Sequence, residues 1–170
     1  LANQKVDHIR VLSDRMFETA LVQDKSVSVR RKPVLASDIV QALKERIERL
    51  QSKGFIITSE MKTSVGSWTL DWTLFERIAD NVFSNLEKYA DPRHPIQIHF
   101  TIEKELRWVA VNRKRKSGQA EHHGIGLASV RQMIETQGGA LTIEESKTTF
   151  KETIVLSRPR RKNDPAERVD

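Results

Sequence analysis

Two segments of this chain each place two strands in direct succession, and this feature constrains the fold more than any other. Apolar residues alternate with polar ones over residues 96–102, and a second strand is predicted over residues 106–111 after a Glu-Lys-Glu turn. A last hairpin is predicted from residues 140–144 and 149–156. Helical periodicity precedes each pair, and this grouping of helices and strands predicts an α+β fold.

Two helices are predicted before the first hairpin. The first runs from an N-cap at Ser37 to Gly54 and leads into a β-rich run over residues 55–58. The second opens with the capping-box sequence Thr-Leu-Phe-Glu at residues 73–76 and ends at the Asp-Pro pair 91–92.

A third helix is predicted to start near Gly126 and Leu127 and to stop at the glycine pair 138–139, after a polar, basic loop over residues 112–123. All three helices can cover the same face of one sheet. The element order therefore predicts a two-layer α/β sandwich with a mixed, mainly antiparallel sheet and three helices on one face.

The segments outside this unit are predicted to be of different kinds. Residues 4–22 have the periodicity of an amphipathic helix, but the segment contains no second element against which its apolar face could pack. We therefore expect this face to pack against a partner. Residues 24–36 are expected to be an extended connector into a domain at 37–156, and residues 157–170 a disordered basic tail. Because the chain begins with Leu1 and shows no signal segment, we expect a fragment of a longer protein.

Composition excludes several classes of protein. The absence of cysteine removes disulfide scaffolds, thiol catalysis and cysteine-based zinc sites, and is compatible with the cytoplasm. The 29 Lys and Arg exceed the 23 Asp and Glu, and basic runs occur at residues 30–32, 113–116 and 158–162. This excess suits nucleic acid, an anionic membrane or a phosphorylated small molecule, although each run also has a simpler interpretation as a solvated loop.

Polar residues recur along one stripe of the second helix. Asn81, Asn85 and Lys88 are spaced i, i+4, i+7, so they share a stripe beside the apolar face. Asn is a poor helix former, so two of them one turn apart require a reason. They are either solvent-facing polar positions or a metal and phosphate site, since a carboxamide oxygen can bind Mg²⁺ and Lys88 a phosphate.

A glycine-containing run leads into the third helix. Gly124 and Gly126 are separated by one residue, follow His122 and His123, and precede Leu127. Glycines at a helix start allow backbone N–H groups to approach an anion, although an ordinary loop-to-helix turn has the same sequence. Together with the asparagine stripe, this run predicts a site that holds a polyanion from two sides.

These two motifs resemble those of a known family. Residues 81–89 resemble the N-box of the histidine-kinase-type ATPase domain, and residues 124–130 with the glycine pair 138–139 resemble its second glycine box. Residues 5–17 are similar to the second helix of the dimerisation hairpin that precedes this domain in sensor kinases, which makes residues 1–23 the end of such a hairpin.

The resemblance implies a protein-histidine kinase that uses ATP and Mg²⁺. It makes Asn85 the Mg²⁺ ligand, Asn81 a second polar contact of the N-box, Lys88 a phosphate contact and Tyr89 a wall beside the adenine. The amides of Gly124 and Gly126 would face the phosphates. The remaining expected ATP-binding residues are Asn112, His123, Ile125, Leu127 and Thr148, the last bordering the adenine.

The chain departs from this family at the first glycine box. An Asp followed by spaced glycines normally recognises the adenine amino group there, whereas this chain has Asn112 followed by the basic run 113–116 and a short lid segment. A carboxamide oxygen still accepts a hydrogen bond, more weakly than a carboxylate. The same fold with a degenerate pocket, acting as a scaffold without nucleotide, is the alternative, and nucleic-acid binding through the basic runs is a third.

The resemblance also implies partners and location. The γ-phosphoryl group of ATP would pass to a histidine on the largely missing hairpin, so no catalytic residue is expected within the fragment and it should not phosphorylate itself. His8 matches the second hairpin helix and is not the expected acceptor. The expected partners are a second copy, through the hairpin, and a response-regulator receiver domain, but no nucleic acid. The fragment is expected in the cytoplasm, with a membrane reached only through missing N-terminal regions.

Overall fold

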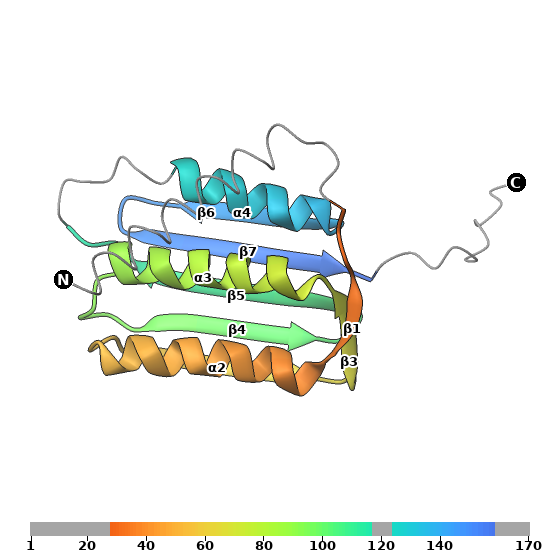
Figure 1. The fold of residues 1–170 in the computed structure, drawn as a ribbon. Helices are drawn as coiled ribbons and strands as arrows, with labels where there is room; N and C mark the ends of the chain where they lie inside the picture. The colour runs from red at the N-terminus through yellow and green to blue at the C-terminus, as the bar shows by residue number, and fades with distance from the viewer. Residues whose placement is uncertain (1–27, 117–123, 159–170) are drawn as a thin grey trace, which may run out of the picture.

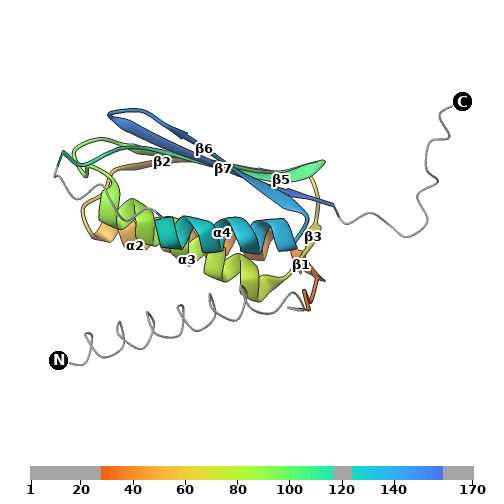
Figure 2. The same cartoon turned by 90° about the horizontal axis from the view of Figure 1, so that it is seen from above.

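The computed structural model describes residues 28–116 and 124–158, which fold into two layers. The elements are β1 (Lys32–Leu35), α2 (Ala36–Ser52), β2 (Ile57–Thr63), β3 (Ser67–Leu70), α3 (Trp72–Tyr89), β4 (Ile96–Ile102), β5 (Glu105–Arg113), α4 (Gly124–Thr136), β6 (Gly139–Glu145) and β7 (Thr149–Ser157). Figures 1 and 2 show α2, α3 and α4 on one face of the larger sheet. The predicted α+β sandwich is confirmed.

The larger sheet has the strand order β2-β4-β5-β7-β6. β2 pairs with β4 in parallel, and every other neighbouring pair is antiparallel. The strands that follow one another in the sequence, β4 with β5 and β6 with β7, form the two predicted hairpins. The sheet is thus mixed and mainly antiparallel, as expected.

The core lies between the helices and this sheet. Residues of β4 alternate between buried and more exposed positions, so that Ile96, Ile98, Phe100 and Ile102 all face the helices. Trp108 of β5 lies among the rings of the core, with its centroid 5.8 Å from that of Phe83. The predicted periodicities therefore identify the faces that pack together.

A second sheet was absent from the sequence prediction. β1 pairs antiparallel with β3, from Lys32 opposite Leu70 to Leu35 opposite Ser67. Trp68 and Leu70 of β3 are buried. Their alternation with polar neighbours was a signal for a strand, but it extends over only four residues.

The predicted start of α2 is wrong. The helix begins at Ala36, with Leu35 at the N-cap and no side-chain cap, instead of being capped by Ser37. The backbone N–H of Ala36 donates to the carbonyl of Gly66, 3.0 Å away, in the turn before β3. A long-range backbone bond therefore replaces the local serine cap that the sequence favoured.

The predicted capping box of α3 is also wrong. Asp71 is the N-cap, and its Oδ1 accepts from the N–H of Leu74 at 3.1 Å. Its Oδ2 accepts from the N–H of Arg30 at 2.8 Å, while its own N–H donates to Oε1 of Gln137 at 3.0 Å. Asp71 thus joins three segments, whereas Thr73 is exposed in the first turn.

Other boundaries differ by a few residues. β2 covers Ile57–Thr63 and not 55–58, and α4 begins at Gly124, two residues before the predicted start. The predicted helix at 4–22, the first residues of the connector (24–27) and the tail after residue 158 lie outside the described residues. The described part of the connector, residues 28–36, contains β1 and the first residue of α2. Within the described part, none of the helices is long and apolar enough to cross a lipid bilayer.

Candidate functional site

The two expected site motifs lie side by side. α3 and α4 are neighbours on the sheet (Figure 2). A Cβ atom added to Gly126 would lie 3.6 Å from Oδ1 of Asn81 and 4.0 Å from Oδ1 of Asn85. Two carboxamide oxygens of α3 therefore face the first turn of α4, where the missing side chain leaves space.

The orientation of Asn81 is set by its own helix. Its Nδ2 donates to the carbonyl of Arg77 at 2.8 Å, one turn earlier. Because the amide nitrogen is used in this bond, the carboxamide oxygen is the atom that faces Gly126. Acceptors that point away from their helix suit a cation better than an anion.

The start of α4 supplies the opposite polarity. The first N–H groups of a helix have no partner within it and carry the positive end of its dipole. Gly124, Ile125, Gly126 and Leu127 form this first turn. A cation at the Asn oxygens and an anion at these amides would lie next to each other, which is the arrangement that a metal-bound phosphate requires.

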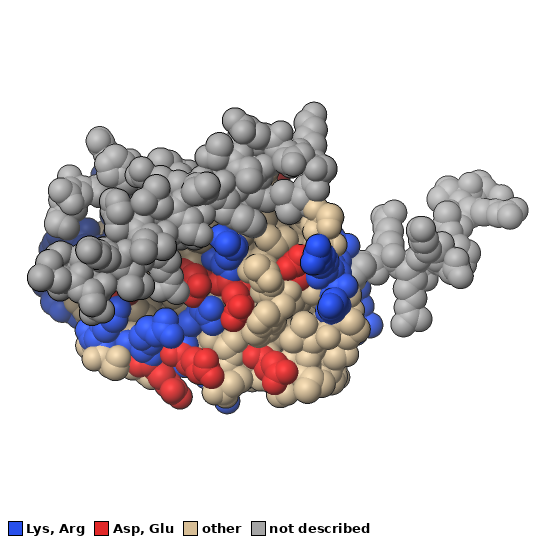
Figure 3. Space-filling view, viewed as in Figure 1, with Lys and Arg blue, Asp and Glu red and all other residues tan. Residues whose placement is uncertain are grey.

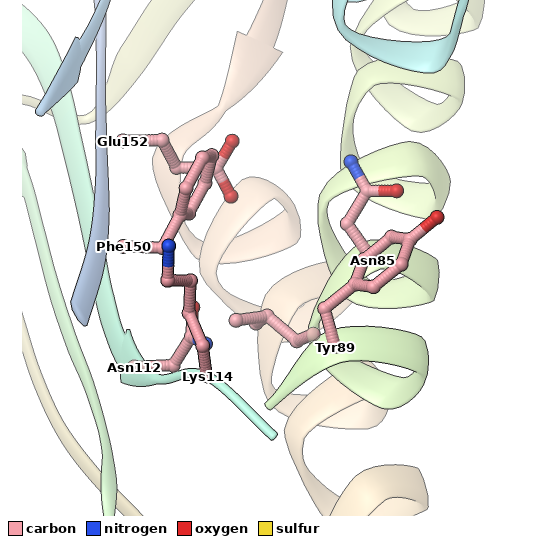
Figure 4. Close-up of a pocket in the computed structure, with 7 residues that line it drawn as sticks. Asn85, Tyr89, Asn112, Lys114, Phe150 and Glu152 are labelled. Carbon is pink, nitrogen blue, oxygen red and sulfur yellow. The ribbon is translucent and has the colours of Figure 1, made fainter. Parts of the chain in front are cut away.

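A small pocket lies beside this junction, between α3 and the sheet (Figure 4). α3 contributes Asn85, Leu86 and Tyr89, and the sheet side contributes Asn112, Lys114, Phe150 and Glu152. Its volume is about 10 Å³, space for roughly one water molecule. The structure thus brings three of the expected site residues, Asn85, Tyr89 and Asn112, to one pocket, but their side chains leave no room for a base.

Asn112 occupies the end of β5 next to β7. It is only 4 % exposed and lies opposite Phe150 in the strand register. Its Nδ2 donates to the carbonyl of Arg113 at 3.0 Å. The carboxamide is therefore fixed at the pocket wall by a local bond.

Lys114 closes the outer side of the pocket. Its Nζ lies 2.8 Å from Oε1 of Glu145, and its N–H donates to the carbonyl of Thr148 at 2.9 Å. Figure 4 shows its side chain extending past Phe150. The expected adenine contact, Thr148, is exposed and does not line the pocket, although its backbone holds Lys114 in place.

One residue of the basic run 113–116, Arg115, binds the C-terminal end of α3. Arg115 Nε donates to the carbonyl of Ala90 at 2.9 Å, and its Nη2 donates to that of Glu87 at 3.1 Å. These carbonyls are at the end of α3, where a guanidinium also complements the helix dipole. Arg115 therefore stabilises the end of α3, although its side chain remains exposed to solvent.

A second arginine closes the end of α4 in the same way. Arg31 Nη2 donates to the carbonyl of Thr136 at 3.3 Å. On the described part of the surface in Figure 3, blue basic and red acidic side chains are interspersed. Arg31 therefore stabilises the end of α4, and the face drawn in Figure 3 shows mixed charge where its residues are described.

The residues that follow α3 form a compact turn. Arg93 donates from Nε and Nη2 to the two carboxylate oxygens of Asp91, at 2.9 and 2.8 Å. These bonds, followed by a backbone bond from Arg93, hold the pKa of Asp91 well below its usual range. The turn fixes the direction in which the chain leaves α3 for β4.

Sequence reasoning missed Glu152. It lies on β7 with its side chain 2 % exposed, and its Oε2 has no hydrogen-bond partner among the described residues. Removal from water raises the pKa of this carboxyl from 4.5 to about 7. The available signal was the alternation of Phe150, Glu152 and Ile154, which places an acidic residue on the buried face of a strand.

Like Thr148, two further expected site residues do not line the pocket. Lys88 is exposed on the last turn of α3, and Leu127 is half-buried in α4; neither lines the pocket. His123 lies outside the described residues. Lys88 lies on the same stripe of α3 as the two asparagines.

Comparison with known proteins gives a family and a set of similar folds. The family described as the GHKL domain matches residues 71–157. No curated protein matches the sequence.

Solved structures of sensor kinases share the fold. The Acinetobacter baumannii histidine kinase AdeS has a TM-score of 0.70 at 15% identity, covering 92% of this chain and 82% of its own. The mycobacterial sensor histidine kinase MprB has a TM-score of 0.56 at 22% identity, covering 77% of this chain and 100% of its own. Full-length ShkA, solved in complex with AMPPNP, has a TM-score of 0.70 at 15% identity, covering 90% of this chain and 36% of its own.

Proposed function

Because the chain belongs to the GHKL domain family, we propose that it binds ATP with Mg²⁺ and acts as the catalytic domain of a sensor histidine kinase. The γ-phosphoryl group of ATP would pass to a histidine on a dimerisation hairpin and from there to a response regulator. The observation that carries this proposal is the position of two carboxamide oxygens, 3.6 and 4.0 Å from the site of a Cβ on Gly126.

The available ligands fit a magnesium ion. Mg²⁺ keeps several waters and takes its other oxygens from one or two protein groups and from substrate phosphates. Oδ1 of Asn85 is such a group. Oδ1 of Asn81 also faces Gly126 and would orient the water molecules that surround the ion. When bound, the ion would neutralise phosphate charge, which is the main contribution that phosphoryl transfer requires.

The remaining residues would position the nucleotide. In this proposal the amides of Gly124, Ile125 and Gly126 face the phosphates, with Lys88 and His123 at their edge. Tyr89 and Asn112 would lie against the base, Thr148 would border the adenine once the pocket opens, and Leu127 would be a further nucleotide contact. Because positioning and charge are enough, no acid or base within residues 37–156 is needed.

The adenine base of ATP can enter the pocket only if the pocket opens. The cavity of about 10 Å³ holds roughly one water, so side chains must move before an adenine can enter. Lys114 is the side chain best suited to do so, because it is long and is held by one ion pair to Glu145 at the protein surface. Surface ion pairs of this kind contribute about 0–1 kcal/mol, so nucleotide binding can displace it.

A scaffold without nucleotide is the second candidate function. The narrow pocket and the neutral Asn112 in place of an acidic residue both favour it. In that case the domain would signal through protein contacts alone. Nucleotide binding distinguishes the two candidates directly.

The decisive variant is Asn85→Ala. Calorimetric titration with ADP and Mg²⁺ is expected to give binding by the wild-type chain and at least a tenfold loss for the variant, because the carboxamide oxygen is gone. Ser84→Ala, a change at the neighbouring half-buried position of α3, is the control and should bind as the wild type does. Unchanged affinity of Asn85→Ala would contradict the assignment, and no binding by the wild type would favour the scaffold.

Partners and location follow from the same proposal. The hairpin helix would pair with that of a second copy, and a receiver domain would accept the phosphoryl group from the hairpin histidine. The domain would work in the cytoplasm as part of a membrane sensor. None of these roles requires nucleic acid.

A further inference from the structure

Glu152 is a buried carboxyl that the proposed phosphate and magnesium site does not use. Its carboxyl is almost completely removed from water, and Oε2 has no hydrogen-bond partner within the described part of the chain. A buried polar atom without a partner loses its hydrogen bonds to water and gains none in return, which destabilises the folded state. A buried acceptor that lines a pocket and has no internal partner is suited to a ligand.

The position of Glu152 relative to Asn112 is fixed by the sheet. Asn112 lies opposite Phe150, and Glu152, two residues later on β7, lies opposite Ala110, two residues earlier on the antiparallel strand β5. Asn112 and Glu152 are therefore diagonal neighbours on the face that the helices cover. The acidic group that is missing at the end of β5 is thus present one strand away, on the wall of the same pocket (Figure 4).

We propose that Glu152 recognises the nucleobase, accepting a hydrogen bond from the exocyclic amino group of adenine. This inference rests on the proposed function and adds to it a residue that selects a 6-aminopurine. Asn112 then fixes the pocket wall, and Phe150 and Leu86 supply apolar contact for the ring.

The carboxyl can do this in either protonation state. Its pKa of about 7 reflects burial alone. The titratable side chains that share its pocket are Tyr89 of α3 and Lys114 after β5, while its register neighbours, Ala110 and Ile143, carry no charge. An ionised carboxylate accepts through both oxygens and a neutral acid through its carbonyl, so an N–H donor is satisfied in both cases.

The test is a thermodynamic cycle that removes the amino group of the ligand and the carboxyl of Glu152 separately and together. The ligands are ADP and purine riboside 5′-diphosphate, which lacks the amino group, each with Mg²⁺. The wild-type chain is expected to bind ADP about tenfold more tightly than the purine analogue. Glu152→Met, a replacement of similar size without a strong acceptor, is expected to reduce this preference to less than twofold.

Two further variants complete the cycle. Glu152→Gln keeps a carbonyl acceptor and should retain most of the preference for ADP. Glu144→Met removes an exposed acid of β6 that pairs with Lys151, outside the pocket, and should leave the preference unchanged. Thermal unfolding of each variant verifies that it is folded; Glu152→Leu replaces Glu152→Met if the latter is not.

The outcomes separate this inference from the proposed function. If the wild type binds ADP and the analogue equally, or if Glu152→Met keeps the full preference, the assignment of Glu152 is overturned while nucleotide binding stands. If the wild type binds neither ligand, both fail.

Discussion

A single buried carboxyl makes the stability of this protein depend on pH. In the folded chain the pKa of Glu152 is raised to about 7, whereas its ordinary value is 4.5. Between these values the folded state holds a proton that the unfolded state has lost. Glu152 therefore reduces stability progressively as the pH rises through this window.

Glu152→Gln is expected to remove this dependence. The neutral amide does not titrate, so the free energy of unfolding of the variant relative to wild type should increase by on the order of 3 kcal/mol from pH 4.5 to pH 8. Urea unfolding of both chains at several pH values measures the difference. A difference that stays constant across this range would contradict the raised pKa.

The glycine pair 138–139 is also explained at the scale of single residues, and each glycine is needed for a different reason. Gly138 has φ of +77°, a conformation that other residues rarely adopt. Gly139 has no positive φ, but a Cβ there would clash with the carbonyl oxygen of Val155. The sequence indicated a helix stop, and only the packing of β6 on β7 shows that the second glycine is needed for close approach.

At the scale of elements, α3 is the helix on which the site depends. Its beginning is held by Asp71, and its end by Arg115 and by the turn at Asp91. Asn81 and Asn85 are in the middle of the helix, so both ends influence where their oxygens lie. Each end is fixed by residues from distant parts of the sequence.

Asp71→Ala is expected to lower the free energy of unfolding by about 1–3 kcal/mol. The change removes the N-cap and leaves the N–H of Arg30 without its acceptor. Thr73→Ala is the matched control, because Thr73 is exposed and caps nothing, and should change stability by less than about 0.5 kcal/mol. Urea unfolding would contradict this account if Thr73→Ala were the more harmful change.

At the scale of the whole molecule, nucleotide binding should couple to folding. α3, α4 and the inner strands β5 and β7 all border the proposed site, so a ligand there bridges both layers. A ligand that binds only the folded state at a hundred times its Kd adds about 2.7 kcal/mol of stability.

ADP with Mg²⁺ at such a concentration is therefore expected to raise the Tm by several degrees. Adding EDTA should remove most of this increase, because the proposed site holds phosphate through the ion. Thermal unfolding with ADP alone, with ADP and Mg²⁺, and with EDTA measures the effect. A rise in Tm that is insensitive to EDTA would contradict the magnesium role of Asn85.

Much of the architecture could be predicted because its signals are local. The alternation in β4, the hairpins and the helical stripe of α3 follow from which residues avoid water along a regular element. The same periodicity placed Asn81 and Asn85 on one stripe, and the glycines identified the start of α4. These features require no knowledge of distant contacts.

Only the tertiary structure decided the rest, because it depends on contacts between residues far apart in the sequence. The start of α2 is set by a backbone bond to Gly66, and Asp71 caps α3 while also binding Arg30 and Gln137. The second sheet exists because β1 and β3 meet. Glu152 enters the pocket because the register of β7 on β5 places it beside Asn112, and burial there raises its pKa.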